Sequence, residues 1–202
     1  MSSFELALGP LERIEAEVLV LPLFEGEIPL RGAVGRIDWR LCGRLSRLAA
    51  AGQLPAEAGA AFLTPGGGGV RARRVLGLGL GPRSAEDFEA WAAAAFDRAR
   101  RLADGPLALA LPDSGERLAP RLAQLASLAR AGEAPQRVCV APEAPDETVA
   151  LQWFRSMARR PQPGGLEIAP PPEGRAPRGA GLAEAATQPA RSSPNPTGRF
   201  TR

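Results

Sequence analysis

The side chains that most often do chemistry at neutral pH are missing from this chain. Its 202 residues include no histidine and no tyrosine, and all 25 basic residues are arginines. Imidazole, phenol and amine groups therefore cannot act as general bases or nucleophiles, which excludes Ser-His-Asp triads and lysine-based phosphate loops. The carboxylates have no histidine beside them to complete a metal site. We expect no catalytic activity, no bound cofactor and no metal.

Two cysteines, Cys42 and Cys139, lie far apart and form no Cys-x-x-Cys motif. In a reducing compartment such residues behave as small apolar side chains, and we expect both to be buried. No run reaches the about 18 to 20 apolar residues of a membrane helix, and Glu5 lies where a secretory signal would be basic. These features favour a cytoplasmic protein that makes no contact with a membrane.

Loops that lead into helices remain as candidate sites, because the free backbone amides of a helix N-terminus attract anions. Two such loops carry the candidate ligand-binding residues. These are Gly32, Ala33, Val34 and Gly35 in the first loop, and Ser114 and Gly115 in the second. The ligand that these amides would hold is a small phosphate-bearing molecule.

The segment Gly77–Ser84 is similar to a dinucleotide-binding Gly-x-Gly-x-x-Gly motif but does not match it. The third glycine would fall on Pro82 or on Ser84, depending on which glycine starts the motif. We therefore predict that Gly77 and Gly79 are strand positions where a helix or another backbone comes close.

The arginines give only a weak nucleic-acid footprint. The net charge is +3, and residues 1–160 hold 20 arginines against 19 acidic residues. Among the local clusters, Arg71, Arg73 and Arg74 are the candidates for DNA contact, together with the arginines near the C-terminus. The near-neutral charge makes nucleic-acid binding the least favoured of the functions considered.

Short apolar runs alternate with amphipathic segments along residues 1–160. The runs predict strands at 4–8, 18–21, 60–64, 74–80, 107–111 and 137–141. Alternation of strand and helix at these intervals is typical of right-handed crossovers and a mainly parallel sheet. The predicted fold class is therefore α/β, a three-layer α/β/α sandwich.

Three helices are marked clearly by their apolar spacing. One is predicted over 33–51, and a second begins after Ser84 as its N-cap. The expected core stripe of the second helix is Phe88, Trp91, Ala95, Phe96, Ala99 and Leu102. The last helix opens at Pro145, and the residues it is expected to bury are Val149, Trp153 and Met157.

The composition changes at Pro161. The last 42 residues hold nine prolines among glycine, serine and alanine, which leaves too little apolar surface to offset the entropy of ordering. We predict one folded domain over 1–160 and a Pro-rich disordered tail over 161–202.

Val18–Leu48, Gly59–Gly68 and Arg71–Trp91 follow one another in a distinctive order, with the sequence VLGLGLG in the last of them. Together they resemble the N-terminal domain of leucyl aminopeptidases. The resemblance implies a macro-like α/β/α fold over about residues 3–160. It also implies kinship with the non-catalytic part of a peptidase, so aminopeptidase activity is expected to be absent.

A macro-like fold implies ADP-ribose binding, but the positions that would specify this ligand differ here. The aspartate expected after Gly9 is Pro10, and the asparagines expected after the second strand are replaced by Leu21, Pro22 and Leu23. A nucleotide without these hydrogen-bonding partners loses most of its specificity.

The favoured function is a non-catalytic macro-like module for protein assembly or regulation, with a protein partner or further copies of the chain. In the peptidases that the sequence resembles, this domain lies at the periphery of a hexamer, and in some bacterial members it takes part in DNA binding. The alternative function is a degenerate macro-type binder of ADP-ribose or another phosphate-bearing ligand. A DNA-binding accessory domain is the further alternative.

Overall fold

The computed structural model describes residues 2–112, 115–132, 134–135, 137–160 and 166–171. The strands within these ranges are β1 (Ser2–Leu6), β2 (Val18–Phe24), β3 (Ala61–Pro65), β4 (Arg74–Gly81), β5 (Leu107–Ala110), β6 (Arg137–Ala141) and β7 (Leu166–Ala169). The α-helices are α1 (Gly32–Arg40), α2 (Arg44–Ala50), α3 (Phe88–Leu102), α4 (Leu118–Arg130) and α5 (Glu147–Ala158). Short 3-10 turns are η1 (Leu11–Arg13), η2 (Arg83–Ala85), η3 (Gly115–Arg117) and η4 (Ala144–Asp146). None of the described helices is both long and apolar enough to span a membrane.

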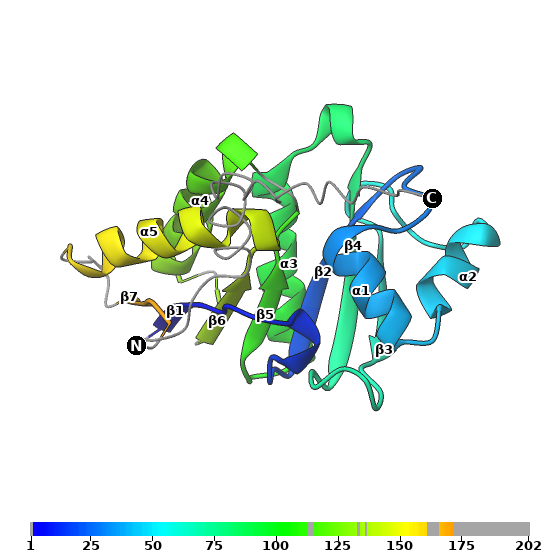
Figure 1. Cartoon of the computed structure of the whole chain (residues 1–202), viewed down its shortest axis with the longest axis horizontal. Coiled ribbons are helices and arrows are strands. Elements are labelled where there is room, and N and C mark those ends of the chain that lie inside the picture. The colour runs from blue at the N-terminus through cyan, green and yellow to red at the C-terminus, as the bar shows by residue number, and fades with distance from the viewer. Residues whose placement is uncertain (1, 113–114, 133, 136, 161–165, 172–202) are drawn as a thin grey trace, which may run out of the picture.

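The strands form a single sheet in the order β3-β4-β2-β5-β6-β1-β7 (Figure 1). All neighbouring pairs run parallel except β3 and β4, which are antiparallel and joined by a short glycine-rich loop. Parallel neighbours require crossover connections, and the helices supply them. The prediction of a mainly parallel sheet is confirmed, with one antiparallel edge.

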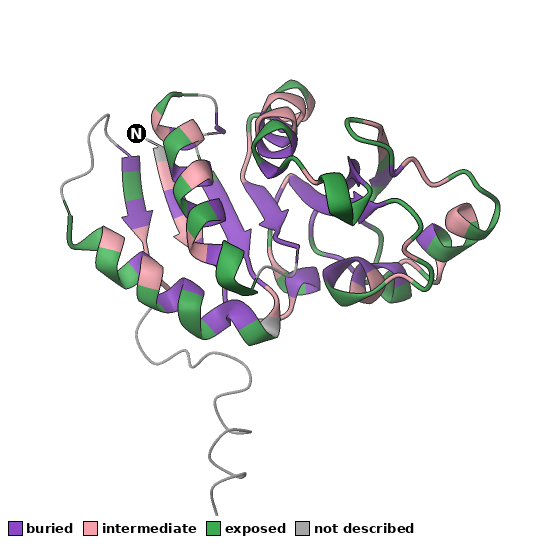
Figure 2. Cartoon of the chain, turned by 90° about the horizontal axis from the view of Figure 1, so that it is seen from above, coloured by how far each residue is buried: buried purple, intermediate pink, exposed green. Residues whose placement is uncertain are grey.

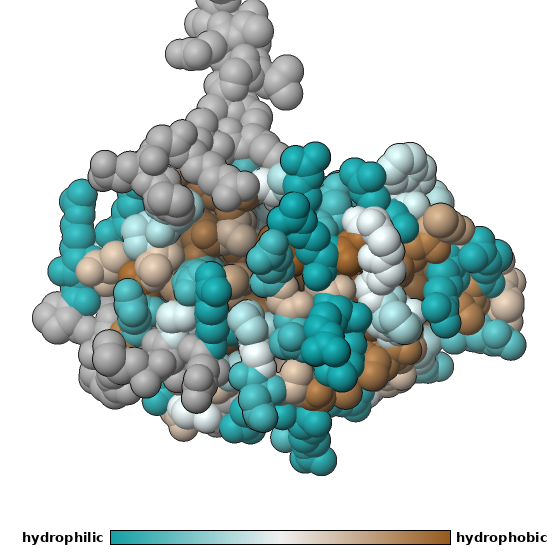
Figure 3. All heavy atoms as spheres, turned by 90° about the horizontal axis from the view of Figure 1, so that it is seen from below, coloured by the Kyte–Doolittle hydropathy of each residue, from teal (hydrophilic) through white to brown (hydrophobic). Residues whose placement is uncertain are grey.

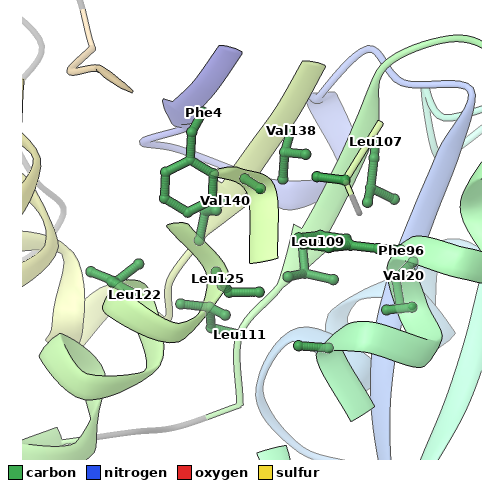
Figure 4. Close-up of a cluster of buried hydrophobic side chains, with 14 of the residues drawn as sticks. Phe4, Val20, Phe96, Leu107, Leu109, Leu111, Leu122, Leu125, Val138 and Val140 are labelled. Carbon is green, nitrogen blue, oxygen red and sulfur yellow. The ribbon is translucent and has the colours of Figure 1, made fainter. Parts of the chain in front are cut away.

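Alternate residues of the central strands β2, β4, β5 and β6 feed two separate apolar cores, whereas β1 and β7 contribute only to the larger one. The larger core joins one face of the sheet to α3, α4 and α5, and Figure 4 shows its centre around Phe4, Phe96 and Leu109. The smaller core joins the other face to α1 and α2 through Ile37 and Leu45. In Figure 2 the strands are mostly buried, whereas the helices carry buried residues on one side and exposed residues on the other. These layers confirm the three-layer α/β/α sandwich.

Two glycines of β4 lie where the sequence predicted close contacts. A Cβ at Gly77 would lie 2.0 Å from the ring of Phe62, and one at Gly79 would lie 1.9 Å from the carbonyl oxygen of Glu57. Any side chain at either position would displace these groups. The two glycines therefore serve packing, as predicted.

The helix predicted over 33–51 is in fact two helices. Cys42 and Gly43 both have positive φ, 55° and 73°, which reverses the chain after α1. Asp38 then accepts the backbone N–H of Leu45 at 2.6 Å and so stabilises the first turn of α2. The turn leaves Cys42 exposed, so the prediction that it is buried is wrong.

Cys139 on β6 is buried, as predicted. Burial and then the neighbouring Glu5 carboxylate raise the pKa of the Cys139 thiol to about 11. A thiol with a raised pKa carries little thiolate at neutral pH and is a poor nucleophile. This cysteine behaves as the small apolar residue that the sequence indicated.

Two helix predictions need correction at their ends. α3 begins at Phe88 rather than after Ser84, because Asp87 is the N-cap and its carboxylate accepts the N–H of Ala90. α5 buries Ala150, Leu151 and Phe154, whereas Val149, which was predicted to be buried, is 45% exposed. The apolar stripe predicted for α3 is buried from Phe88 to Ala99, and Leu102 is only partly buried.

The predicted tail contains a strand of the sheet. β7 pairs in parallel with β1, and Leu166 and Ile168 are buried on the larger core while Glu167 between them is exposed. The prediction of a disordered tail is therefore wrong for these residues, because two alternating apolar side chains suffice to add an edge strand. Residues 161–165 and 172–202 of that predicted tail lie outside the described residues.

Candidate functional site

A cleft of about 490 Å³ opens where β2, β5 and β6 end, at the upper end of β2 in Figure 1. Three of its lining residues, which we call its floor, are Pro22 in the second half of β2 and Leu111 and Pro112 directly after β5. The loop from β2 to α1 forms one wall, and Glu143, just after β6, forms part of the other. This is the edge at which ligands bind in parallel α/β sheets.

Three of the predicted ligand-binding residues line this cleft. Gly32, Ala33 and Val34 form the first turn of α1 beside it. Gly35 lies outside the lining, and its N–H donates to the carbonyl oxygen of Arg31 as the first hydrogen bond of the helix. Gly115 begins η3 outside the lining, and Ser114 lies outside the described residues.

A residue that sequence reasoning missed occupies the anion position of this site. The backbone N–H of Ala33 donates to Oε1 of Glu143 at 2.5 Å, and Nη1 of Arg36 donates to Oε2 at 3.0 Å. The N-terminus of a helix attracts negative charge, and here the chain supplies that charge itself. The carboxylate lies where the predicted amides would have held a phosphate.

A second ion pair lies at the far rim of the cleft. Arg83 forms an ion pair with Glu27 at 2.9 Å, and its guanidinium lies 4.0 Å from the ring centre of Phe24. Both the positive charge and the face of the guanidinium are therefore engaged within the chain. Three of the four charged residues that line the cleft, Glu27, Arg83 and Glu143, therefore already have partners within the chain.

The floor of the cleft is held from below by a buried arginine. Arg121 of α4 forms an ion pair with Glu86, donates to the carbonyl oxygen of Pro112 at 3.4 Å, and lies over the ring of Phe88. Burial lowers the pKa of Arg121, and the charge of Asp146 acts in the opposite direction. An arginine stays protonated through such a shift, so its role is to fix the loop after β5.

A known family resembles this domain in sequence, and solved structures resemble it in fold. Residues 20–133 match the family model of the cytosol aminopeptidase family, N-terminal domain. This chain belongs to that family. The match confirms the resemblance seen in the sequence, and it covers the segment from β2 to the end of α4. No curated protein matches the chain.

Solved structures show that this cytosol aminopeptidase N-terminal domain has the macrodomain fold. A macrodomain of Thermus aquaticus DarG is 12% identical, with 70% of this chain and 99% of that chain covered at a TM-score of 0.54. The macro domain of ganglioside induced differentiation associated protein 2 is 16% identical, with 82% and 86% covered at 0.56. An Oceanobacillus iheyensis macrodomain is 13% identical, with 76% and 90% covered at 0.50.

Within this N-terminal domain, the replaced positions on β2 face away from the cleft or offer it no polar group. Leu21 and Leu23 are fully buried in the smaller core, and Pro22 between them contributes only apolar surface to the floor. Residues of a strand alternate between its two faces, so only Pro22 of the three replaced residues lies at the cleft. Proline has no polar side-chain group to offer a ligand.

Three of the arginines considered for DNA contact have partners in the domain, and those near the C-terminus lie outside the described residues. Arg71 pairs with Glu15 at 2.9 Å, Arg73 pairs with Glu17 at 3.3 Å, and Arg74 donates to a backbone carbonyl oxygen of α3. Seen from below, the surface mixes hydrophilic and apolar residues (Figure 3). The carboxylates of Glu15 and Glu17 therefore offset two of the three positive charges of this cluster.

Proposed function

We propose that this domain is a non-catalytic macro-like module for protein assembly or regulation. One observation carries the proposal: Glu143 occupies the first turn of α1, where a phosphate group would otherwise be held. The carboxylate satisfies the amide and the helix dipole together, and an incoming phosphate would have to displace it and meet its charge. The cleft has kept its shape while its anion position is closed.

The surface beside the closed position supports an interaction role. Ile28, in the loop before α1, is 67% exposed, and Trp39, near the end of α1, is 73% exposed. These are the two most exposed large apolar side chains among the described residues. Exposed aromatic residues are typical of protein interfaces, where they anchor binding.

The residue types support a role without catalysis. The chain has no histidine, lysine or tyrosine, and its buried cysteine has a raised pKa. The described carboxylates form no cluster that could hold a metal ion. Two free thiols suit a reducing compartment, and the cytoplasm is the one we propose.

Sedimentation velocity over a range of concentrations tests the assembly role. We expect the full chain, alone or with a partner purified under native conditions, to sediment faster than its 21.1 kDa monomer. The double change Ile28→Ser with Trp39→Ser should return it to the monomer. Val149→Ser, at an exposed apolar position on α5, is the matched control and should leave assembly unchanged. A monomer that retains no partner would contradict the proposal.

A second candidate function rests on the volume of the cleft. A cavity of about 490 Å³ falls in the range of small-molecule sites, so a macro-type ligand remains an alternative. Titration calorimetry with ADP-ribose and with pyrophosphate separates the two candidates. The assembly role predicts no heat at millimolar ligand, and heat from the unaltered chain would favour the second candidate instead.

A further inference from the structure

A separate groove of about 440 Å³ runs along the outer face of α1, beside the cleft. We call it the α1 groove. Its residues from the helix are Gly32, Gly35, Arg36, Trp39 and Arg40, and Glu12 of η1 closes the side. It contains no part of the cleft floor, and it shares with the cleft only the turn at Arg31 and Gly32.

The helix residues that line the groove all lie on one face of α1. Positions 32, 35, 36, 39 and 40 repeat at intervals of three and four, so they lie along one side of α1. The glycines hollow the first half, and a Cβ at Gly35 would lie 2.6 Å from the carbonyl oxygen of Leu30. Trp39 forms a wall at the other end, with the guanidinium of Arg40 4.9 Å from its ring centre.

Two buried polar atoms in this groove have no hydrogen-bond partner. They are Oε2 of Glu12 and Nε of Arg36. Glu12 is only 9% exposed, and Arg40 donates to its other oxygen, Oε1, at 2.9 Å. Arg36 uses Nη1 to bind Glu143, which leaves its Nε–H available. Buried polar atoms without partners are rare in folded proteins and point to a missing group.

The missing group must offer both hydrogen-bond types at once. Oε2 of Glu12 accepts an N–H, and Nε–H of Arg36 donates to a carbonyl oxygen. An extended peptide backbone presents N–H and C=O groups in this way, and one of its side chains can pack on Trp39. A phosphate backbone would instead bring negative charge against the open oxygen of Glu12.

The charge around the groove selects the kind of peptide. Arg31, Arg36 and Arg40 line it, and since Arg36 pairs with Glu143 and Arg40 pairs with Glu12, the excess is the one positive charge of Arg31. An acidic peptide complements this excess, and a basic one is repelled. Residues 172–202 of this chain hold five arginines and two glutamates, so their charge is wrong for the groove.

We propose that the α1 groove binds an acidic, extended peptide segment of a partner protein. Binding turns the buried Oε2 of Glu12 and the buried Nε–H of Arg36 toward the groove. One peptide N–H then binds the oxygen, one peptide C=O accepts from the nitrogen, and an apolar side chain packs on Trp39. This inference rests on the proposed assembly role and names its surface and the chemistry of its partner.

Selection of a random dodecapeptide library on the full chain tests the inference. We expect enriched peptides to be acidic, and to shift the indole N–H of Trp39 and the Nε–H of Arg36 in proton–nitrogen spectra of the labelled chain. Enrichment of basic peptides, shifts confined to other surfaces, or no enrichment would each overturn the proposal. Binding of a twelve-residue oligothymidylate in this groove would also overturn it.

Three variants separate the hydrogen bonds from the general charge. Arg36→Lys keeps a positive charge beside Glu143 but removes the Nε–H, and Glu12→Met keeps most of the side-chain length but removes both carboxylate oxygens. Each variant should weaken the binding of the selected peptide at least tenfold. Trp39→Ala should do the same, whereas Val149→Ala should leave the affinity unchanged. Trp39 is exposed, so its variant tests binding even where a change at Glu12 disturbs folding. Unchanged affinity in Trp39→Ala and Arg36→Lys would contradict the groove.

The assembly role and the α1 groove can be overturned separately. An assembly seen by sedimentation that persists in both Trp39→Ala and Arg36→Lys would overturn the α1 groove and leave the assembly role standing. A chain that remains monomeric and without partner in the same experiment would overturn the assembly role itself.

Discussion

Two glutamates on opposite sides of α1 are equally buried and differently bonded. The side chain of Glu143, in the cleft, is 12% exposed, and that of Glu12, in the α1 groove, is 10% exposed. Glu143 has a partner for each oxygen, the N–H of Ala33 and the guanidinium of Arg36. Glu12 has a partner for Oε1 only, because both contacts from Arg40 go to that oxygen.

The difference shows which side of α1 still has binding capacity. At the anion position of the cleft, the N–H of Ala33 and the carboxylate of Glu143 are already paired within the chain, so an anion that binds there must first break existing bonds. In the groove, an added ligand completes bonds that the fold leaves open. The edge of the sheet at which parallel α/β folds bind ligands is thus the closed region, and the outer helix face is the open one.

The largest expected effect comes from removing the paired carboxylate. Glu143→Ala leaves the N–H of Ala33 and the charge of Arg36 without their acceptor, so the free energy of unfolding should fall by about 2 kcal/mol. Urea denaturation measures this loss. The same variant should gain measurable heat with pyrophosphate, because the first turn of α1 is then open to an anion. Glu143→Gln is the control, since its amide oxygen can still accept from Ala33 and should keep part of the stability.

A smaller loss is expected from the half-paired carboxylate. Glu12→Gln weakens the contact with Arg40, but nothing is lost at Oε2, so the free energy of unfolding should fall by about 1 kcal/mol. Urea denaturation of both glutamine variants side by side provides the comparison. Equal losses at Glu12 and Glu143 would remove the distinction between the two regions.

The stability of the chain should decline in acid, partly through Glu12. Burial raises the pKa of this carboxyl, but its own backbone N–H and Arg40 outweigh burial and hold the pKa below the ordinary value of 4.5. Glu5, which Arg137 and Ser3 bind, has its pKa lowered in the same way against burial. A lowered pKa contributes stability above pH 4.5, and this contribution is lost as the pH falls through the lowered pKa. Unfolding free energies at pH 7 and across the acid range should show a shallower decline for Glu12→Gln than for the unaltered chain.

The smallest effect on stability is expected at the wall of the groove. Trp39 is mostly exposed, so Trp39→Ala should change the free energy of unfolding by less than about 0.5 kcal/mol. Thermal unfolding measures this, with Val149→Ala as a second exposed site. A large loss would show that Trp39 serves the fold rather than a partner.

The elements that sequence alone predicted well are those with long periodic patterns. The buried stripe of α3 and the apolar runs of β2 and β4 gave the fold class, because period and length leave few alternatives. The break at Cys42 and the strand β7 were missed, since a continuous apolar spacing hides a turn and four residues among prolines carry little pattern. Val149 was wrongly predicted to be buried, because α5 packs on the core through the neighbouring face that carries Ala150, Leu151 and Phe154.

The site was harder to predict than the fold. The first turn of α1 was found from its glycines and small residues, but Glu143 lies 110 positions away from Ala33 and has no local signal. Only the topology, which ends β2 and β6 at the same edge of the sheet, brings the two together. The partnership of Glu12 with α1 arises in the same way, from a short turn after β1 that packs on the helix.

The place of β7 at the sheet margin has a practical consequence for shortening the protein. A chain cut after residue 160 would bare the hydrogen-bonding row of β1 that Leu166–Ala169 now covers. It would also uncover the apolar patch beneath Leu166 and Ile168. Bare parallel strands of this kind recruit strands from other molecules, so the shortened protein would aggregate through its N-terminal strand.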